Sequence, residues 1–134
     1  MRYIRAIPRM HWDRREKRFR SLAFKPSSVD RGISVFEREC AIHTSGGICG
    51  HARAFYLQIS GDPPIFWEFS SNTLPKDAEL VSSPILNGDP GHFDIAGLND
   101  KQARDFFKTI PLSDFEICNN GTSRKLTLAD LPTD

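Results

Sequence analysis

The sequence predicts an α+β fold, a small and mostly antiparallel sheet with one principal helix, at about residues 100–109, packed on it. Short β-prone segments bounded by Pro, Gly and Asn recur along the chain, whereas a single segment shows the apolar spacing of an amphipathic helix. The 134 residues suit one domain, spanning 1–134, that is long enough to bury a core.

The expected strands are segments in which apolar and aromatic residues dominate and a turn residue follows. They are 2–7, 21–24, 32–37, 54–59, 65–69, 78–82, 92–96 and 115–118, of which 21–24 and 32–37 are strand or turn–strand units. Residues 54–59 and 65–69 flank Asp62-Pro63-Pro64, so we expect them to form a hairpin. The stretch 10–20 is expected to be one or two polar helical turns or an exposed loop, and 40–51 to be a glycine-rich loop.

The helix prediction depends on its two ends and on the apolar residues between them. Asn99 is a suitable N-cap, Phe106 and Phe107 lie on one helical face, and Pro111 ends the pattern. Residues 126–131 are expected to form a short helix that docks on the domain.

Charge is distributed unevenly along the chain. Residues 1–40 contain eleven Lys or Arg against five Asp or Glu, and residues 41–134 contain seven against twelve. The basic N-terminal segment 1–40 is therefore expected either to contact an acidic partner or to fold back on the chain's own acidic surface.

Aromatic residues are interleaved with these cations. Phosphates need cations and unstacked bases need flat rings, so this mixture is typical of a single-stranded nucleic-acid interface. The alternative is a solvated basic face whose aromatic rings turn into the core. The candidate binding residues are Arg9, Trp12, Arg14, Arg15, Arg18, Arg20 and Lys25.

Two thiols and two imidazoles occur within twelve residues, at Cys40, His43, Cys49 and His51. These are zinc ligand types, but their spacing is not that of a zinc finger or ribbon. The expectation is no metal and no cofactor. Three cysteines, an odd number, fit a reducing compartment, and without an apolar run or secretory signal the chain is expected to be cytoplasmic and to have no membrane partner.

The candidate catalytic residues are His11, Ser21, Ser34 and His92. In a strand at 92–96, His92 and Asp94 share a face, so the carboxylate could orient the imidazole for acid–base chemistry. The alternative is an ordinary surface hydrogen bond. No serine-hydrolase motif accompanies Ser21 or Ser34, so the sequence by itself does not support a nucleophilic serine.

Short elements follow one another at Trp12, Ser21-x-x-Phe24-x-Pro26, Asp30-x-Gly32-Ile33-Ser34-Val35 and Pro90-Gly91-His92-x-x-Ile95-x-Gly97-Leu98. Their order resembles a group of small uncharacterised bacterial proteins, in which a Trp precedes Ser-x-x-Ala-Phe, Asp-x-x-Leu-Ser-Val and Pro-x-His-x-x-Ile-x-Gly elements. The resemblance covers about half of the chain. It implies a bacterial or phage origin and a site that these elements surround, and it carries no known activity.

These observations favour a binding or interaction module that contacts an acidic protein or single-stranded nucleic acid through its basic N-terminal face. One alternative is a toxin-type enzyme that modifies a nucleotide or nucleic acid, with a pocket that gathers the candidate catalytic residues and Arg5. Another is an immunity or inhibitor protein, which would expose an acidic surface on residues 62–116. The oligomeric state is left open.

Overall fold

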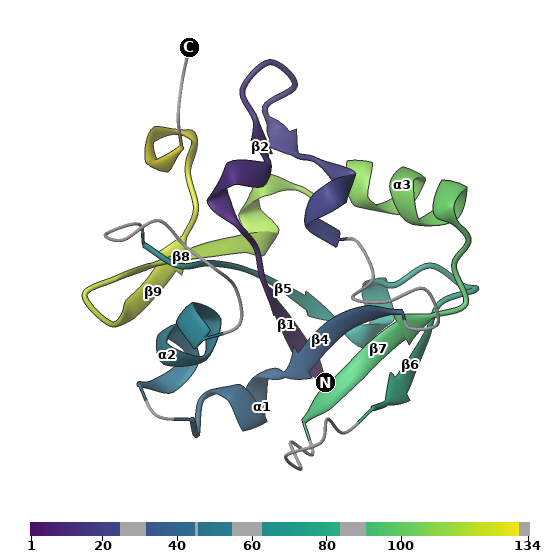
Figure 1. Cartoon of the computed structure of the whole chain (residues 1–134), viewed down its shortest axis with the longest axis horizontal. Helices are drawn as coiled ribbons and strands as arrows, with labels where there is room; N and C mark the ends of the chain where they lie inside the picture. Colours follow the sequence, from purple (N-terminus) through teal and green to yellow (C-terminus); the bar gives the residue numbers. More distant parts are fainter. Residues whose placement is uncertain (25–31, 45, 55–62, 84–90, 132–134) are drawn as a thin grey trace.

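A computed structural model describes residues 1–24, 32–44, 46–54, 63–83 and 91–131. The strands of its main sheet are β1 (Arg2–Ala6), β4 (Ile33–Glu37), β5 (Ile65–Ser70), β6 (Glu79–Ser82), β7 (His92–Ala96), β8 (Phe115–Asn119) and β9 (Thr122–Lys125). Their order is β6-β7-β4-β1-β5-β8-β9, and neighbouring strands are antiparallel (Figure 1). This confirms the predicted α+β class.

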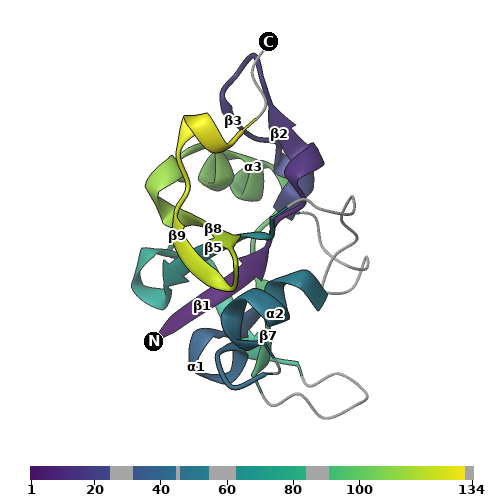
Figure 2. The ribbon, with the colours of Figure 1, turned by 90° about the vertical axis from the view of Figure 1, so that its left-hand side faces the viewer.

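Helices and a small hairpin cover the two faces of this sheet. The helices are α1 (Arg38–Ala41), α2 (Gly47–Ala54) and α3 (Asp100–Lys108), and the hairpin consists of β2 (Trp12–Asp13) and β3 (Arg18–Phe19). Figure 2 shows α3 and the hairpin on one side of the sheet, and α1 and α2 on the other. The sheet therefore lies between two layers, one formed by α3 and the hairpin and the other by α1 and α2.

The larger core lies on the α3 side, because alternate strand residues point to opposite faces of a sheet. Val35 and Trp67 point into it, and the ring of Phe24 stacks on that of Phe107 at 4.1 Å between centroids. Phe24 comes from a 3-10 turn, Ser21–Phe24, which packs on α3; the strand or turn–strand unit predicted at 21–24 is wrong. The smaller core, on the α2 side, contains Phe36.

The predicted principal helix is confirmed as α3, and its N-terminus has the expected cap. The Asn99 side chain accepts a hydrogen bond from the Gln102 backbone N–H at 2.8 Å, and the Gln102 side chain accepts one from the Asn99 N–H at 2.9 Å. This reciprocal capping box satisfies two N–H groups that the first helical turn leaves without partners. The docking helix expected near the C-terminus is a single 3-10 turn, Leu128–Asp130.

The glycine-rich loop predicted at 40–51 is wrong, because α1 and α2 occupy much of it. Gly46 and Gly47 have φ angles of 82° and 68°, so the glycines are needed only in the break between the two helices. The strand predicted at 54–59 begins at Ala54, which ends α2, and its other residues lie outside the described ones. In place of the predicted hairpin with that segment, β5 pairs with β1 and β8.

Residues 10–20 form neither polar helical turns alone nor a plain loop. A 3-10 turn at Arg9–His11 leads into the β2–β3 hairpin, whose tip places Lys17 at a φ of 53°. In the described part of the chain, none of the helices has the length and apolar content that crossing a membrane requires.

Candidate functional site

Ser34 and His92, two of the four candidate catalytic residues, are hydrogen-bonded to each other. Ser34 lies on β4 and His92 on the adjacent strand β7, and 2.9 Å separates Ser34 Oγ from His92 Nε2. The register pairs Phe36 with His92 and Ser34 with Asp94, so all four side chains share the face that α2 covers.

The second ring nitrogen of His92 fixes the tautomer of the imidazole. His92 Nδ1 is hydrogen-bonded to the backbone carbonyl oxygen of Ser83, which accepts hydrogen bonds and does not donate them. Nδ1 therefore carries the proton, and Nε2 accepts a hydrogen bond from the Ser34 hydroxyl. Only 2 % of His92 is exposed, so this orientation is held inside the protein.

Asp94 is a buried carboxylate beside this pair. It is 6 % exposed, and its Oδ1 atom has no hydrogen-bond partner within the described residues. Opposite residues in an antiparallel pair have Cβ atoms about 5 Å apart, which places the carboxylate close to Ser34. A buried carboxylate oxygen without a hydrogen bond is costly, so Oδ1 of Asp94 is an unsatisfied polar atom beside the pair.

Arg5 links the Ser34 backbone to the other side of the sheet. Its guanidinium donates to the Ser34 carbonyl at 2.8 Å and to the Ala23 carbonyl at 3.1 Å. Strands β1 and β4 pair at Tyr3 with Glu37 and at Ile4 with Phe36. Arg5 follows Ile4, so its side chain joins the two strands just beyond their last paired residues. Burial lowers the pKa of Arg5 to about 10, and the side chain is still charged at neutral pH.

His11 lies within electrostatic reach of Arg5. Burial lowers the pKa of His11, and the positive charges of Arg20 and Arg5 lower it further. Its Nδ1 is buried and lacks a hydrogen-bond partner in the described part of the chain. Ser21 is exposed in the 3-10 turn that packs on α3, on the opposite face of the sheet from the Ser34 hydroxyl. The structure thus pairs Ser34 with His92 and places Ser21 elsewhere.

The basic residues of the β2–β3 hairpin face solvent. Arg14, Arg15 and Lys17 are exposed and Arg18 is half-buried, and among the described residues none of the four forms an ion pair. Arg20 pairs with Asp13 at 3.7 Å between Nε and Oδ2. In the described structure, this part of the basic segment does not fold back on the acidic remainder of the chain.

Helix α3 adds cations that the sequence analysis missed. Arg18 and Arg20 of the hairpin segment meet Arg104 and Lys108 of α3 around a pocket of about 190 Å³. Asp13, Phe19, Ser21 and Phe107 complete the lining. On α3, Arg104 and Lys108 have the four-residue spacing of a shared helix face, but sequence alone does not show that this face adjoins the hairpin.

Trp12 and Arg9, two of the predicted binding residues, do not contribute to this surface. Trp12 is 6 % exposed and packs edge-to-face on Phe19 at 5.1 Å between centroids, so its ring is in the core and offers no face to a base. Arg9 donates to the Asp130 carbonyl at 3.0 Å, near the C-terminal end. Lys25 lies outside the described residues.

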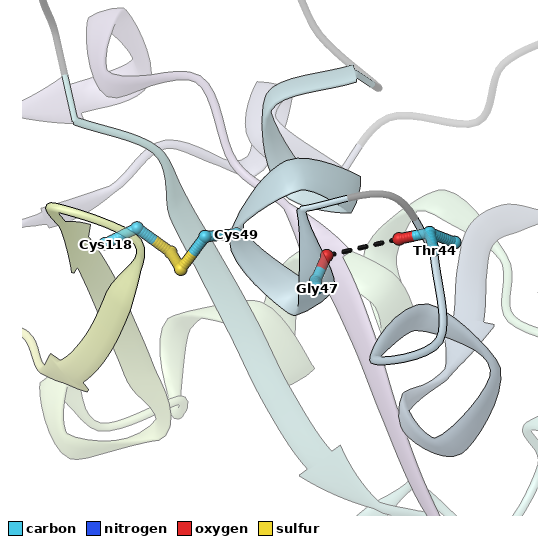
Figure 3. The surroundings of a disulfide bond; sticks show 4 residues. All are labelled: Thr44, Gly47, Cys49 and Cys118. Carbon is cyan, nitrogen blue, oxygen red and sulfur yellow. Dashed lines mark hydrogen bonds between the residues drawn. A yellow bond between two sulfur atoms is a disulfide. The ribbon is translucent and has the colours of Figure 1, made fainter.

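The candidate metal ligands are divided between other roles. Cys49 of α2 forms a disulfide with Cys118 of β8, with 5.8 Å between Cα atoms, so the expectation that the cysteines stay reduced is wrong for this pair (Figure 3). Figure 3 also shows Thr44, which donates to the Gly47 carbonyl at 3.1 Å between α1 and α2. His51 packs its ring on Phe36 at 4.5 Å between centroids. The described residues contain no group of three His, Cys, Asp or Glu side chains arranged to hold a metal ion.

No protein-family model matches this chain, and no curated protein or solved structure matches it significantly.

Proposed function

We propose that the protein is an interaction module that contacts an acidic protein through a basic face. This basic face comprises five cations of the hairpin segment, of which all but Arg18 are exposed, and the two of α3 beside them. Its residues are Arg14, Arg15, Lys17, Arg18, Arg20, Arg104 and Lys108.

The observation that carries the proposal is the convergence of cations from two distant parts of the chain, of which only Arg20 forms an ion pair among the described residues. Like charges that gather on one surface repel one another, and Asp13, which lines the same pocket, pairs with Arg20 alone of these cations. Hydrogen bonds from the Glu16 and Arg15 backbone N–H groups, together with Arg20 and Arg18, hold the pKa of Asp13 below its usual value. An anionic partner would offset the remaining repulsion.

A protein partner fits this surface better than a single-stranded nucleic acid. Base stacking needs exposed rings, whereas Trp12, Phe19 and Phe24 are at most 6 % exposed. Five of the seven cations are arginines, whose planar guanidinium groups bind carboxylates in a bidentate way. The proposed ligand groups are therefore Asp and Glu side chains on the surface of another protein.

The test is to titrate the protein with poly-L-glutamate and with an oligothymidylate, by fluorescence anisotropy at low and at physiological salt. Arg18→Gln with Arg104→Gln should weaken polyglutamate binding about tenfold, because each exposed charge contact contributes up to about 1 kcal/mol. Raising the salt should weaken wild-type binding as well, because exposed charges are screened.

The matched control is Arg53→Gln with Lys76→Gln, which removes the same charge from exposed residues outside the basic face. This variant should bind polyglutamate like the wild type. Equal weakening in both variants would mean that polyglutamate binding depends on net charge alone and not on the basic face. Tighter wild-type binding to the oligothymidylate than to polyglutamate at physiological salt would contradict a protein partner and favour nucleic acid.

A cytoplasmic location stays a prediction of the sequence. The disulfide between Cys49 and Cys118 counts against it, because structural disulfides persist mainly in oxidising compartments. Alkylation of the protein in extracts of its native cells, followed by mass analysis, would report whether the two thiols are free.

A further inference from the structure

We propose that Ser34 is a nucleophile activated by His92, and that the site around them transfers the acyl group of a carboxylic ester. This activity goes beyond the interaction of the basic face and uses the opposite side of the sheet. It also revises the expectation from sequence motifs, which gave no support to a nucleophilic serine.

The geometry is that of a nucleophile, a base and a group that orients the base. The Ser34 hydroxyl lies 2.9 Å from His92 Nε2, and the Ser83 carbonyl holds the proton on Nδ1. The imidazole therefore presents its unprotonated nitrogen to the hydroxyl, which is the protonation state a general base needs.

Asp94 supplies what the neutral Ser83 carbonyl does not, a negative charge near the imidazole. His92 and Asp94 are two positions apart on β7, and both side chains lie on the same face of the sheet. As a carboxylate on the same face, Asp94 would favour the imidazolium that forms when His92 takes a proton. The lack of any hydrogen-bond partner for Oδ1 within the described residues fits a group used for its charge.

Arg5 is a positioning residue in this scheme. Its hydrogen bond to the Ser34 carbonyl fixes the backbone from which Oγ projects, at the point where β1 and β4 stop pairing. Ser34 is half-buried, whereas His92 is almost fully buried, so the nucleophile is the more exposed member of the pair.

The proposed reaction has two steps. Ser34 Oγ attacks the carbonyl carbon of the ester and its proton moves to His92 Nε2; the bond to the leaving alcohol then breaks, and His92 returns the proton to that alcohol. Water next attacks the acyl–Ser34 ester and gives a proton to His92, which passes it to Oγ as the carboxylic acid departs. The net reaction is hydrolysis of one ester to an acid and an alcohol.

The direct test uses a fluorophosphonate probe on the full-length protein, with peptide mapping by mass spectrometry. Oγ forms the bond to phosphorus, fluoride leaves, and His92 takes the proton. We expect one adduct, on Ser34, which Ser34→Ala abolishes and His92→Gln slows at least about 100-fold, the usual contribution of a general base. Ser113→Ala is the matched control and should be labelled at the wild-type rate, because Ser113 is exposed in the 3-10 turn Leu112–Asp114, outside the site.

Two further readouts separate catalysis from a structural hydrogen bond. The labelling rate of the wild type should rise with pH and reach a plateau once the imidazole is unprotonated, and turnover of p-nitrophenyl acetate should follow the same profile. Ser34→Cys keeps the size of the side chain, and its thiol should react with iodoacetamide faster when His92 is present than with His92→Gln. Absence of an adduct on folded wild-type protein, an adduct on another serine, or a rate that does not depend on His92 would overturn the proposal.

Discussion

Cys49 and Cys118 join α2 to the sheet across 69 residues of chain, with their Cα atoms 5.8 Å apart. Helix α2 carries His51, whose ring packs on Phe36, and Phe36 in turn packs on His92 at 4.9 Å between ring centroids. The disulfide thus anchors α2, whose His51 ring packs on Phe36 next to the Ser34–His92 pair.

Replacing both cysteines, Cys49→Ala with Cys118→Ala, should lower the free energy of unfolding by about 4 kcal/mol. Closing a loop of this length removes that much chain entropy from the unfolded state. Urea unfolding followed by circular dichroism measures the change, and reductant should shift the wild type toward the variant. Cys40→Ala keeps the disulfide, so it is the control and should respond to reductant as the wild type does. A wild type that reductant leaves unchanged would contradict a stabilising disulfide.

Gly32 allows β4 to approach β7 next to the candidate site. A β-carbon at this position would overlap the Ile95 carbonyl oxygen, so Gly32→Ala must push the strands apart. We expect a loss of about 1–3 kcal/mol, together with a weakened Ser34–His92 hydrogen bond visible in the imidazole nitrogen shifts by NMR. Gly121→Ala is the control, since its cost comes from a φ of 80° in a remote turn and the imidazole shifts should not move. Equal shifts in both variants would contradict this local role.

Arg5→Met should lower the free energy of unfolding by about 2–4 kcal/mol. It removes hydrogen bonds to the Ser34 and Ala23 carbonyls and leaves both acceptors without this partner. Arg2→Met is the control. Arg2 is half exposed and pairs with the buried Glu68, which keeps Arg38 as a partner, so a loss under about 1 kcal/mol is expected. Urea unfolding compares the two, and equal losses would argue against a bridging role for Arg5.

Asp130 makes stability depend on acid. Arg124 and hydrogen bonds from Thr127 hold the pKa of Asp130 well below its usual range in the folded protein. Its contribution is therefore complete above the unfolded carboxyl pKa of about 4 and is lost as the pH falls through the lower folded value. Asp130→Asn should cost up to about 1 kcal/mol at neutral pH, because Arg124 is half exposed, and progressively less below about pH 4.

Chemical unfolding of both proteins at neutral and acid pH checks this expectation. Asp105→Asn serves as the control, because its partner Lys101 is largely exposed and solvent screens the pair. A difference between wild type and Asp130→Asn that stays constant across the pH range would mean that the carboxylate contributes nothing through its charge.

Local patterns predicted the elements whose signals lie within a few residues of one another. The Asn99 cap and the apolar spacing before Pro111 marked α3, and the strand at 92–96 is β7. The glycine-rich composition of residues 40–51 predicted a loop, and that prediction was wrong. Gly46 and Gly47 adopt positive φ angles at the junction between the two helices. The residues on either side of this junction form α1 and α2.

The sequence by itself determined the α+β class, the candidate residues Ser34 and His92, and the excess of cations near the N-terminus. Only the tertiary structure decided that Ser34 bonds to His92, that Arg104 and Lys108 adjoin the hairpin, that Trp12 is buried, and that Cys49 pairs with Cys118. These relationships depend on strand register and on the packing of layers between residues far apart in the chain. Hydrophobic periodicity gives the face on which a side chain lies, but it does not say which distant residue will lie opposite.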